Sequence, residues 1–101
     1  MMPVLVDDPT ILLARALRIS ARAAGATIFV VATDETAWAS ATIVGVRHRI
    51  DLAVEPSAAL DRWLAALPDA DLRVRGHLVA DLVVTRHDDR VTLAILSIVS
   101  D

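Results

Sequence analysis

The sequence predicts an α+β fold in which two helix–strand–strand units build one four-stranded antiparallel sheet, with residues 1–101 forming a single domain. Two observations carry this prediction. A helical pattern followed by two β-rich segments occurs twice, in units of roughly 45 residues. In addition, the segment from Val91 to Val99 is apolar at nearly every position. A strand that is apolar on both sides must be covered on both faces, which predicts a central place in the sheet.

The first helix is predicted from Pro9 to about Ala24, with Asp8 as its N-cap and Gly25 as its left-handed end. One side repeats at helical spacing and should be buried: Leu13, Ala16, Leu17, Ser20 and Ala24. Another side carries Arg15, Arg18 and Arg22. Such a basic stripe is typical of a solvated face, and binding of an acidic partner or of phosphates is the alternative. Residues Met1 to Val6 could add a short edge strand.

The first strand is predicted from Thr27 to Ala32, followed by a turn at Thr33–Thr36 and a second strand from about Ser40. Trp38 then falls in the hairpin loop, where a contact with a partner is the functional alternative to packing. The second strand alternates between an apolar side and a charged side. The apolar side carries Val44, Val46, His48, Ile50, Leu52 and Val54, and the charged side carries Arg47, Arg49 and Asp51. A lone histidine on an apolar side is more often a satisfied core residue than a ligand.

The second helix opens at Pro56 and Ser57 and ends at Pro68. Its apolar residues are Leu60, Trp63, Leu64 and Leu67, and Trp63 is expected in the core. A strand is predicted from Leu72 to Thr85, with Gly76 as a bulge or bend. If Asp88 and Asp89 form the tip of the last hairpin, three pairs face each other: Thr85–Thr92, Val83–Ala94 and Leu82–Ile95. A slip by one residue is the alternative, because Asp-Asp is not a favoured tip.

Packed as a two-layer sandwich with both helices on one face of the sheet, these elements give a circularly permuted ferredoxin-like αββαββ fold. The second and fourth strands are central in that topology. The other sheet face stays open and is predicted to bind a partner or a second copy, giving a homodimer. The predicted contact residues are Val79, Asp81, Val83, Leu96, Ile98, Arg47, Arg49 and Trp38, with the arginines, including Arg73 and Arg75, toward the edges.

The composition supports a protein partner more than a nucleic acid. Hydrophobic residues make up 55% of the chain and the mean hydropathy is +0.56, which exceeds the usual apolar share of about 45–50%. The net charge of −3 and the lack of aromatic residues on the open face argue against nucleic-acid binding. No signal peptide or membrane span is evident, so we expect a soluble chain. All ten basic residues are arginine, which favours a bacterial source with a GC-rich genome.

The chemistry-bearing residues make no pattern typical of an enzyme. His77 and His87 lie about ten residues apart, which is some 30 Å along a strand, so they cannot share a metal ion. The paired acids, such as Asp34-Glu35, fall at a cap or in predicted turns. The chain has no cysteine, no nucleophile elbow and no glycine-rich phosphate loop. We therefore expect no catalysis, cofactor, metal ion or small-molecule substrate.

The segment Ile50-Asp-Leu-Ala-Val-Glu-Pro-Ser-Ala-Ala-Leu-Asp-Arg-Trp-Leu-Ala-Ala-Leu67, with the hairpin that follows to Ser100, resembles the soluble domains of bacterial type II secretion M proteins and pilus-assembly O proteins. There a strand leads into a helix with an "aL..WLa.L" pattern and then a strand pair, and the first half from Leu17 looks similar. The resemblance implies a permuted ferredoxin-like fold, dimerisation and a non-catalytic scaffold role in an inner-membrane assembly platform. It assigns no functional residue.

Members of that family have an N-terminal membrane span and a coiled-coil-like linker, which this sequence lacks. The chain is therefore expected to be either an excised periplasmic domain or a chain that shares only the fold. The competing interpretation is a small free-standing cytoplasmic protein that binds or inhibits another protein, such as an immunity, phage-encoded or regulatory factor.

Overall fold

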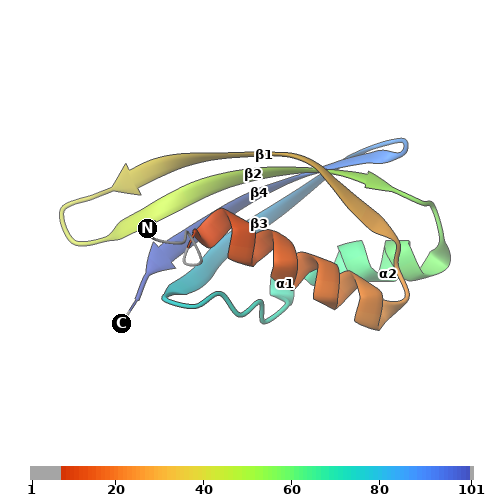
Figure 1. The fold of residues 1–101 in the computed structure, drawn as a ribbon, viewed down its shortest axis with the longest axis horizontal. Coiled ribbons are helices and arrows are strands. Elements are labelled where there is room, and N and C mark those ends of the chain that lie inside the picture. The colour runs from red at the N-terminus through yellow and green to blue at the C-terminus, as the bar shows by residue number, and fades with distance from the viewer. Residues whose placement is uncertain (1–7, 101) are drawn as a thin grey trace, which may run out of the picture.

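A computed structural model describes residues 8–100 of the chain. This part has an α+β fold of two α-helices and a four-stranded antiparallel sheet (Figure 1). The elements are α1 (Pro9–Ala24), β1 (Ile28–Ala39), β2 (Val44–Val54), α2 (Ala58–Ala66), a 3-10 turn (Leu67–Asp69), β3 (His77–His87) and β4 (Arg90–Val99). The predicted strand at Met1–Val6 lies outside the described residues.

The strands are arranged in the order β1-β2-β4-β3, so β2 and β4 are central, as predicted. The predicted register of the last hairpin is also confirmed: Thr85 lies opposite Thr92, Val83 opposite Ala94 and Leu82 opposite Ile95. Asp88 adopts a φ of 53° in the tight turn. A short acidic side chain tolerates this left-handed conformation better than most, which lets Asp-Asp serve as the tip.

Both helices begin at the predicted residues and α1 ends at the predicted Gly25, whereas α2 ends at Ala66 and Pro68 lies in the 3-10 turn that follows. The Asp8 carboxylate accepts the N–H of Thr10 at 2.9 Å, and Gly25 ends α1 with a φ of 81°. Ser57 caps α2 by accepting the N–H of Leu60 at 2.9 Å. The buried side of α1 is rotated from the predicted one: Thr10, Leu13, Ala14, Leu17 and Ala21 are buried. Alanines lie on both sides of the line from Leu13 to Leu17, so the periodicity of apolar residues alone could not decide which side of the helix is buried.

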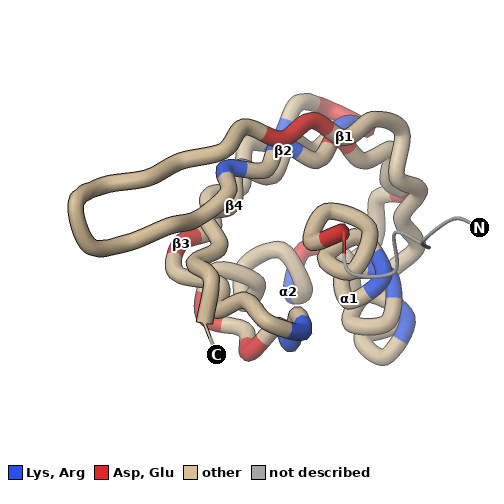
Figure 2. Tube along the Cα trace, turned by 60° about the vertical axis from the view of Figure 1, so that its left-hand side comes forward, with Lys and Arg blue, Asp and Glu red and all other residues tan. Residues whose placement is uncertain are grey.

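One core cluster joins the helices to alternate residues of the sheet. Its helical members are Leu13, Leu17, Ala21, Leu60, Trp63 and Leu64, and its members on the central strands are Ile50, Leu52, Val54, Val91, Leu93 and Ile95. Figures 1 and 2 show α1 and α2 next to each other beneath the arch of strands. Trp63 is a core residue, as predicted, and its Nε1–H donates to the Ser20 hydroxyl at 3.0 Å. That bond satisfies the polar end of the indole.

The predicted turn at Thr33–Thr36 is wrong, because β1 continues through it to Ala39. An edge strand has one row of backbone groups facing solvent and tolerates exposed polar side chains, so the polar run does not end it. The chain turns at Ser40 instead, where the Ser40 N–H donates to the Ile43 carbonyl at 2.8 Å and the Ser40 hydroxyl accepts the Ile43 N–H at 3.2 Å. Trp38 therefore lies in a strand opposite Gly45, not in a loop.

The third strand begins at His77, five residues after the predicted start at Leu72. Gly76, with a φ of 77°, sits in a turn closed by a bridge between Val74 and His77, and is not a bulge within the strand. The bulge of β3 falls between Val79 and Asp81. Because the bulge adds one residue, each residue of β3 before it lies on the sheet face opposite to the one that strict alternation predicts.

Gly45 allows the central strands to approach each other at the start of β2. A Cβ placed there would lie 2.4 Å from the carbonyl oxygen of Ser97 on β4. We expect Gly45→Ala to lower the free energy of unfolding by about 1–3 kcal/mol, because the two backbones must separate. Urea denaturation followed by circular dichroism measures the loss. Ala39→Val, at the exposed end of β1, is the control and should change stability by less than about 0.5 kcal/mol. Equal losses in both variants would contradict the steric explanation.

Candidate functional site

The sheet residues that alternate with the core residues form a second surface, which we call the open face. Residues directly opposite each other in antiparallel strands share a face, so the register defines this set. The open face comprises Phe29, Ala32, Asp34, Thr36 and Trp38 of β1, Gly45, Arg47, Arg49, Asp51 and Ala53 of β2, Arg90, Thr92, Ala94, Leu96 and Ile98 of β4, and Leu78, Asp81, Val83, Thr85 and His87 of β3. The core cluster described above contains none of them.

Seven of the eight predicted contact residues lie together on the open face. Arg47, Asp81, Val83 and Leu96, with Ala94 between them, line one hollow of about 270 Å³. The arginine and the aspartate come from β2 and β3, on either side of the small Ala94 and the larger Leu96 of β4. Arg47 and Arg49 were predicted toward the edges, but their strand is central. The face therefore combines apolar residues with charges of both signs.

Val79 is the predicted contact residue that the structure places elsewhere. It lies opposite Ser97 and packs against the core cluster. Strict alternation would put Val79 and Asp81 on the same face, but the bulge between them inserts one extra residue and turns Val79 inward. Leu78 takes the outward place opposite Ile98 and is 61% exposed.

The predicted placement of Arg73 and Arg75 at the edge of the open face is also wrong. Both precede β3, in the connection from α2, and they line a groove with residues of α1. The strand starts later than its apolar alternation indicated, because Leu72 and Val74 are buried without belonging to a ladder. The two arginines therefore belong to a different surface.

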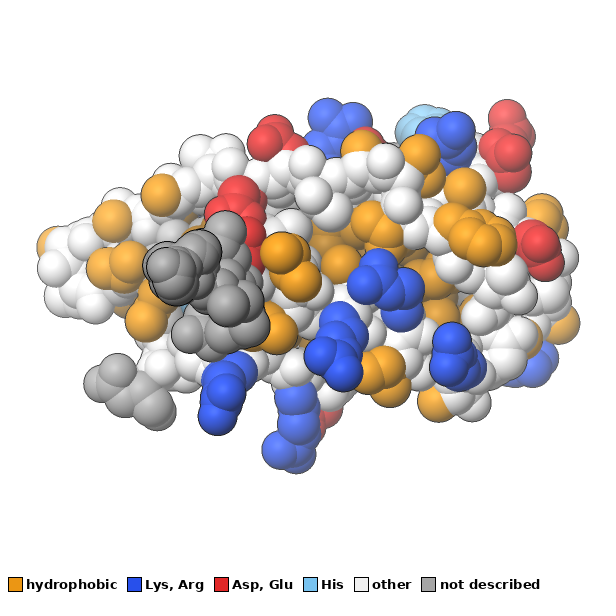
Figure 3. Space-filling view, in the orientation of Figure 1, with side chains coloured by type: hydrophobic (Ala, Val, Ile, Leu, Met, Phe, Trp, Pro, Cys, Tyr) orange, Lys and Arg blue, Asp and Glu red, His pale blue; other side chains and the backbone are white. Residues whose placement is uncertain are grey.

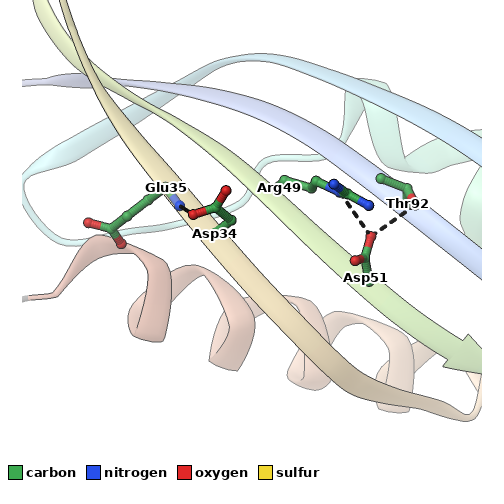
Figure 4. Close-up of polar contacts among 5 residues, drawn as sticks. All are labelled: Asp34, Glu35, Arg49, Asp51 and Thr92. Atoms are coloured by element: carbon green, nitrogen blue, oxygen red, sulfur yellow. Dashed lines mark hydrogen bonds and ion pairs between the residues drawn. The ribbon is translucent and has the colours of Figure 1, made fainter.

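Charged side chains of the open face are held by neighbours on the same face. Asp51 accepts from the Thr92 hydroxyl at 2.9 Å and pairs with Arg49 at 3.4 Å (Figure 4). The guanidinium carbon of Arg47 lies 5.7 Å from the centroid of the Trp38 ring, within the range of a cation–π contact. That contact joins an aromatic side chain and a cation next to the hollow. The prediction that the open face lacks aromatic residues is therefore wrong, because β1 continues to Ala39 and places Trp38 on this face. Of the two observations against nucleic-acid binding, only the net charge of −3 remains.

A second candidate is a chain of polar side chains on the core-facing side of the sheet. The Thr10 hydroxyl bonds to the Glu35 carboxylate and lies 2.9 Å from Nδ1 of His48. Nε2 of His48 lies 2.8 Å from the Ser97 hydroxyl, which in turn lies 3.4 Å from Nδ1 of His77. A carboxylate can only accept, so Thr10 donates to Glu35 and accepts from Nδ1–H of a neutral His48, while Ser97 donates to Nε2.

The distance between Ser97 and His48 lies within the range for a nucleophile and its base, which makes the pair a candidate for catalysis. The Ser97 side chain belongs to a residue that is 1% exposed, however, and His48 is 3% exposed. Neither side chain is accessible to a substrate in this arrangement. The pair therefore satisfies buried polar groups and links β2 to β4, and the prediction that His48 is a satisfied core residue is confirmed.

The partners of His48 were not predictable individually, because Thr10, Glu35 and Ser97 come from three distant segments. The sequence did contain one indication of the contact between His48 and Ser97. His48 and Ser97 are the polar residues on the core-facing sides of β2 and β4, and they belong to neighbouring strands. Two isolated polar residues on adjacent apolar strand faces favour a mutual hydrogen bond over two separate functions.

Within residues 8–100, no group of three or more acidic or histidine side chains is arranged to bind a metal ion, and neither helix is long and apolar enough to span a membrane. The chain matches no protein-family model, no curated protein and no solved structure. The open face and the side chains that surround it are therefore the features from which a function can be inferred.

The buried polar chain predicts a pH-dependent stability. Burial lowers the pKa of His48, and the repulsion from His77 adds to this, while Glu35 and Asp8 act in the opposite direction. Above the ordinary histidine pKa of about 6.5, His48 is neutral in both the folded and the unfolded chain. Below it, the unfolded chain binds a proton that the fold resists, so the free energy of unfolding should fall as the pH drops from about 6.5.

Urea denaturation at several pH values between about 7.5 and 5 measures this slope. His48→Gln should flatten it, whereas His87→Gln, at the exposed end of β3, should leave it unchanged. A slope that survives in the His48 variant would assign the pH dependence to another group.

Proposed function

We propose that the protein is a non-catalytic protein–protein interaction module that self-associates through its open face. The observation that supports this most directly is the composition of that face: apolar residues flanked by charges of both signs, on a surface that contributes nothing to the core cluster. Exposed apolar patches with a polar surround are typical of protein interfaces. The scaffold role in a bacterial secretion or pilus platform, which the resemblance implies, is the form of this function that we favour.

We further propose that the fold is the circularly permuted ferredoxin-like sandwich, with both helices on the sheet face opposite the open face. The order of elements and the strand order β1-β2-β4-β3 agree with that topology. The contribution of both helices to one core cluster supports the same arrangement. A sheet covered on one face only leaves the other available for a partner.

The apolar part of the open face is large enough for a weak interaction. Val83 is 51% exposed, and Leu96 and Ile98 are partly exposed next to the outward Leu78. Full burial of one such side chain contributes about 1.5–3 kcal/mol. Association costs about 4–15 kcal/mol in lost freedom of movement, so apolar burial alone supports a weak dimer. Charge complementarity must then add to the affinity and select the geometry.

The charges favour one arrangement of two copies packed face to face. A two-fold axis parallel to the strands places β2 of one copy over β4 of the other, and β1 over β3. Arg47 then lies over Leu96 of the partner and beside its Asp81, while Trp38 lies over its Leu78. Each arginine can thus enter the hollow of the other copy, and the contact occurs twice by symmetry.

An axis perpendicular to the strands gives a less favourable result. It places β2 over β2 of the other copy, which brings Arg47 and Arg49 toward the same two arginines of the partner. Juxtaposed like charges at an interface cost free energy and oppose association. The distribution of charge over the four strands therefore favours the parallel axis.

The proposed interface predicts that Leu96→Glu makes the protein monomeric. A second carboxylate beside Asp81 would have to share the single guanidinium of Arg47 from the other copy, so each contact would bury one uncompensated negative charge. Sedimentation equilibrium over a wide concentration range measures the association. Ala65→Glu, on the exposed side of α2, introduces the same charge elsewhere and should leave the dimer intact. A wild-type protein that stays monomeric at millimolar concentration would refute the proposed function.

A charge exchange tests the geometry. Arg47→Asp and Asp81→Arg should each abolish self-association, because each places two like charges together at both contacts. An equimolar mixture of the two variants should form a heterodimer, since both contacts then regain opposite charges. Native mass spectrometry distinguishes the species. Homodimers of the single variants, or a mixture that does not associate while the wild type does, would exclude the parallel axis and leave self-association itself intact.

The alternative function is a small binding or inhibitor protein for a different partner. The hollow between Arg47 and Asp81 favours this candidate if the wild type is monomeric, since an arginine or apolar side chain of another protein could fill it. A pull-down from the source organism that yields a stable complex, lost in Leu96→Glu and retained in Ala65→Glu, would support that function.

A further inference from the structure

A groove of about 450 Å³ runs between α1 and the connection that leads from α2 to β3. Its apolar lining consists of Leu12, Ala16 and Ile19 of α1 and Ala70 and Leu72 of the connection. Ile19 is 62% exposed. The lining shares no residue with the open face, so this groove is a separate surface.

The charged residues around the groove are almost all basic. Arg15 lies on the α1 side, and Arg73 and Arg75 lie on the side of the connection, where Asp71 pairs with Arg73 at 3.3 Å. Arg18 and Arg22 continue the basic surface along α1, around Ile19. Figure 3 shows arginine side chains around hydrophobic ones over the part of the molecule where Figure 1 draws α1. The net charge of the chain is −3, so this concentration of positive charge is local.

We propose that this groove binds an anionic amphiphile, with a carboxylate or phosphate head between the arginines and an apolar tail along α1. Arginine binds both kinds of head group through paired N–H donors. The volume falls in the range of about 300–1,000 Å³ that is usual for small-molecule sites. Leu12 and Ile19 are separated by seven residues of helix, or about 10 Å, which gives the tail a short apolar path. This site is independent of the proposed self-association.

An apolar tail fits the lining better than an extended peptide does. The backbone N–H and C=O groups along this part of α1 are used within the helix. The Ser20 hydroxyl, also in the lining, already accepts from Trp63. An extended peptide would bury backbone donors and acceptors with few partners here, at a cost in free energy. A hydrocarbon chain makes no such demand.

The sequence showed only half of this site. The stripe of Arg15, Arg18 and Arg22 was interpreted as a solvated face, with phosphate binding as the alternative. The other half comes from Arg73 and Arg75, which the sequence placed on the sheet. Only the late start of β3 brings these residues beside α1.

Amide proton–nitrogen NMR spectra of the full chain, titrated with dodecanoate and separately with dodecyl phosphate below their micelle concentrations, test the proposal. Saturable shifts confined to α1 and residues 70–75 are expected with at least one of them, and the stronger of the two identifies the head group. Dodecyltrimethylammonium carries the same tail with a positive head and should not produce them. No saturable binding of either anionic amphiphile, or an equal response to the cationic one, would overturn the proposal.

Variants of the groove make the test specific to these side chains. Arg15→Glu combined with Arg75→Glu should weaken binding by about tenfold or more, because the head group then meets negative charge. Arg62→Glu, on the exposed side of α2, is the matched control for a single reversal and should have little effect. Ala16→Trp fills the groove without a change in charge and should also weaken binding, with folding checked by thermal denaturation. Unchanged binding in the double variant and in Ala16→Trp would rule the groove out.

Discussion

The pairing of β2 with β4 is the constraint on which the rest of the structure depends. Each of these central strands has a neighbour on either side, and its side chains alternate between the core and the open face. Val91, Leu93 and Ile95 of β4 enter the core cluster, whereas Thr92, Ala94 and Leu96 alternate with them on the open face. β4 is therefore largely apolar on both sides, with one side in the core and the other on the open face.

The same pairing brings the buried polar groups together at one end of the sheet. Gly45 permits a backbone approach to Ser97 that any side chain would prevent, and the Ser97 hydroxyl reaches His48 on the same face. From there the hydrogen bonds extend through Thr10 to Glu35, which ties α1 and the edge strand β1 to the central strands. Each of these buried polar groups has a hydrogen-bond partner. The network therefore favours one packing of α1 and β1 against the central strands at this end of the sheet.

Much of the fold followed from local patterns, and the errors have a common physical origin. Capping by Asp8 and Ser57 and the register of the last hairpin depend on residues close together in the chain, so the sequence predicted them correctly. The turn at Thr33–Thr36 and the outward placement of Val79 failed because they depend on context. An edge strand accepts polar residues that a central one rejects, and a one-residue bulge reverses alternation without a distinctive sequence. The polar chain and the arginine-lined groove each join segments that only the tertiary structure brings together.

The open face and the groove along α1 differ in their distribution of charge, and this difference decides which of them is suited to bind a second copy. A surface that pairs with itself about a two-fold axis must contain both members of each complementary contact. The open face satisfies this condition, since Arg47 and Asp81 lie on it together with the apolar residues between them. The groove along α1 does not, because Arg15, Arg73 and Arg75 would face their own copies with Asp71 as the acid in the lining. The proposed self-association therefore belongs to the sheet, and the ligand proposed for the groove must carry the opposite charge.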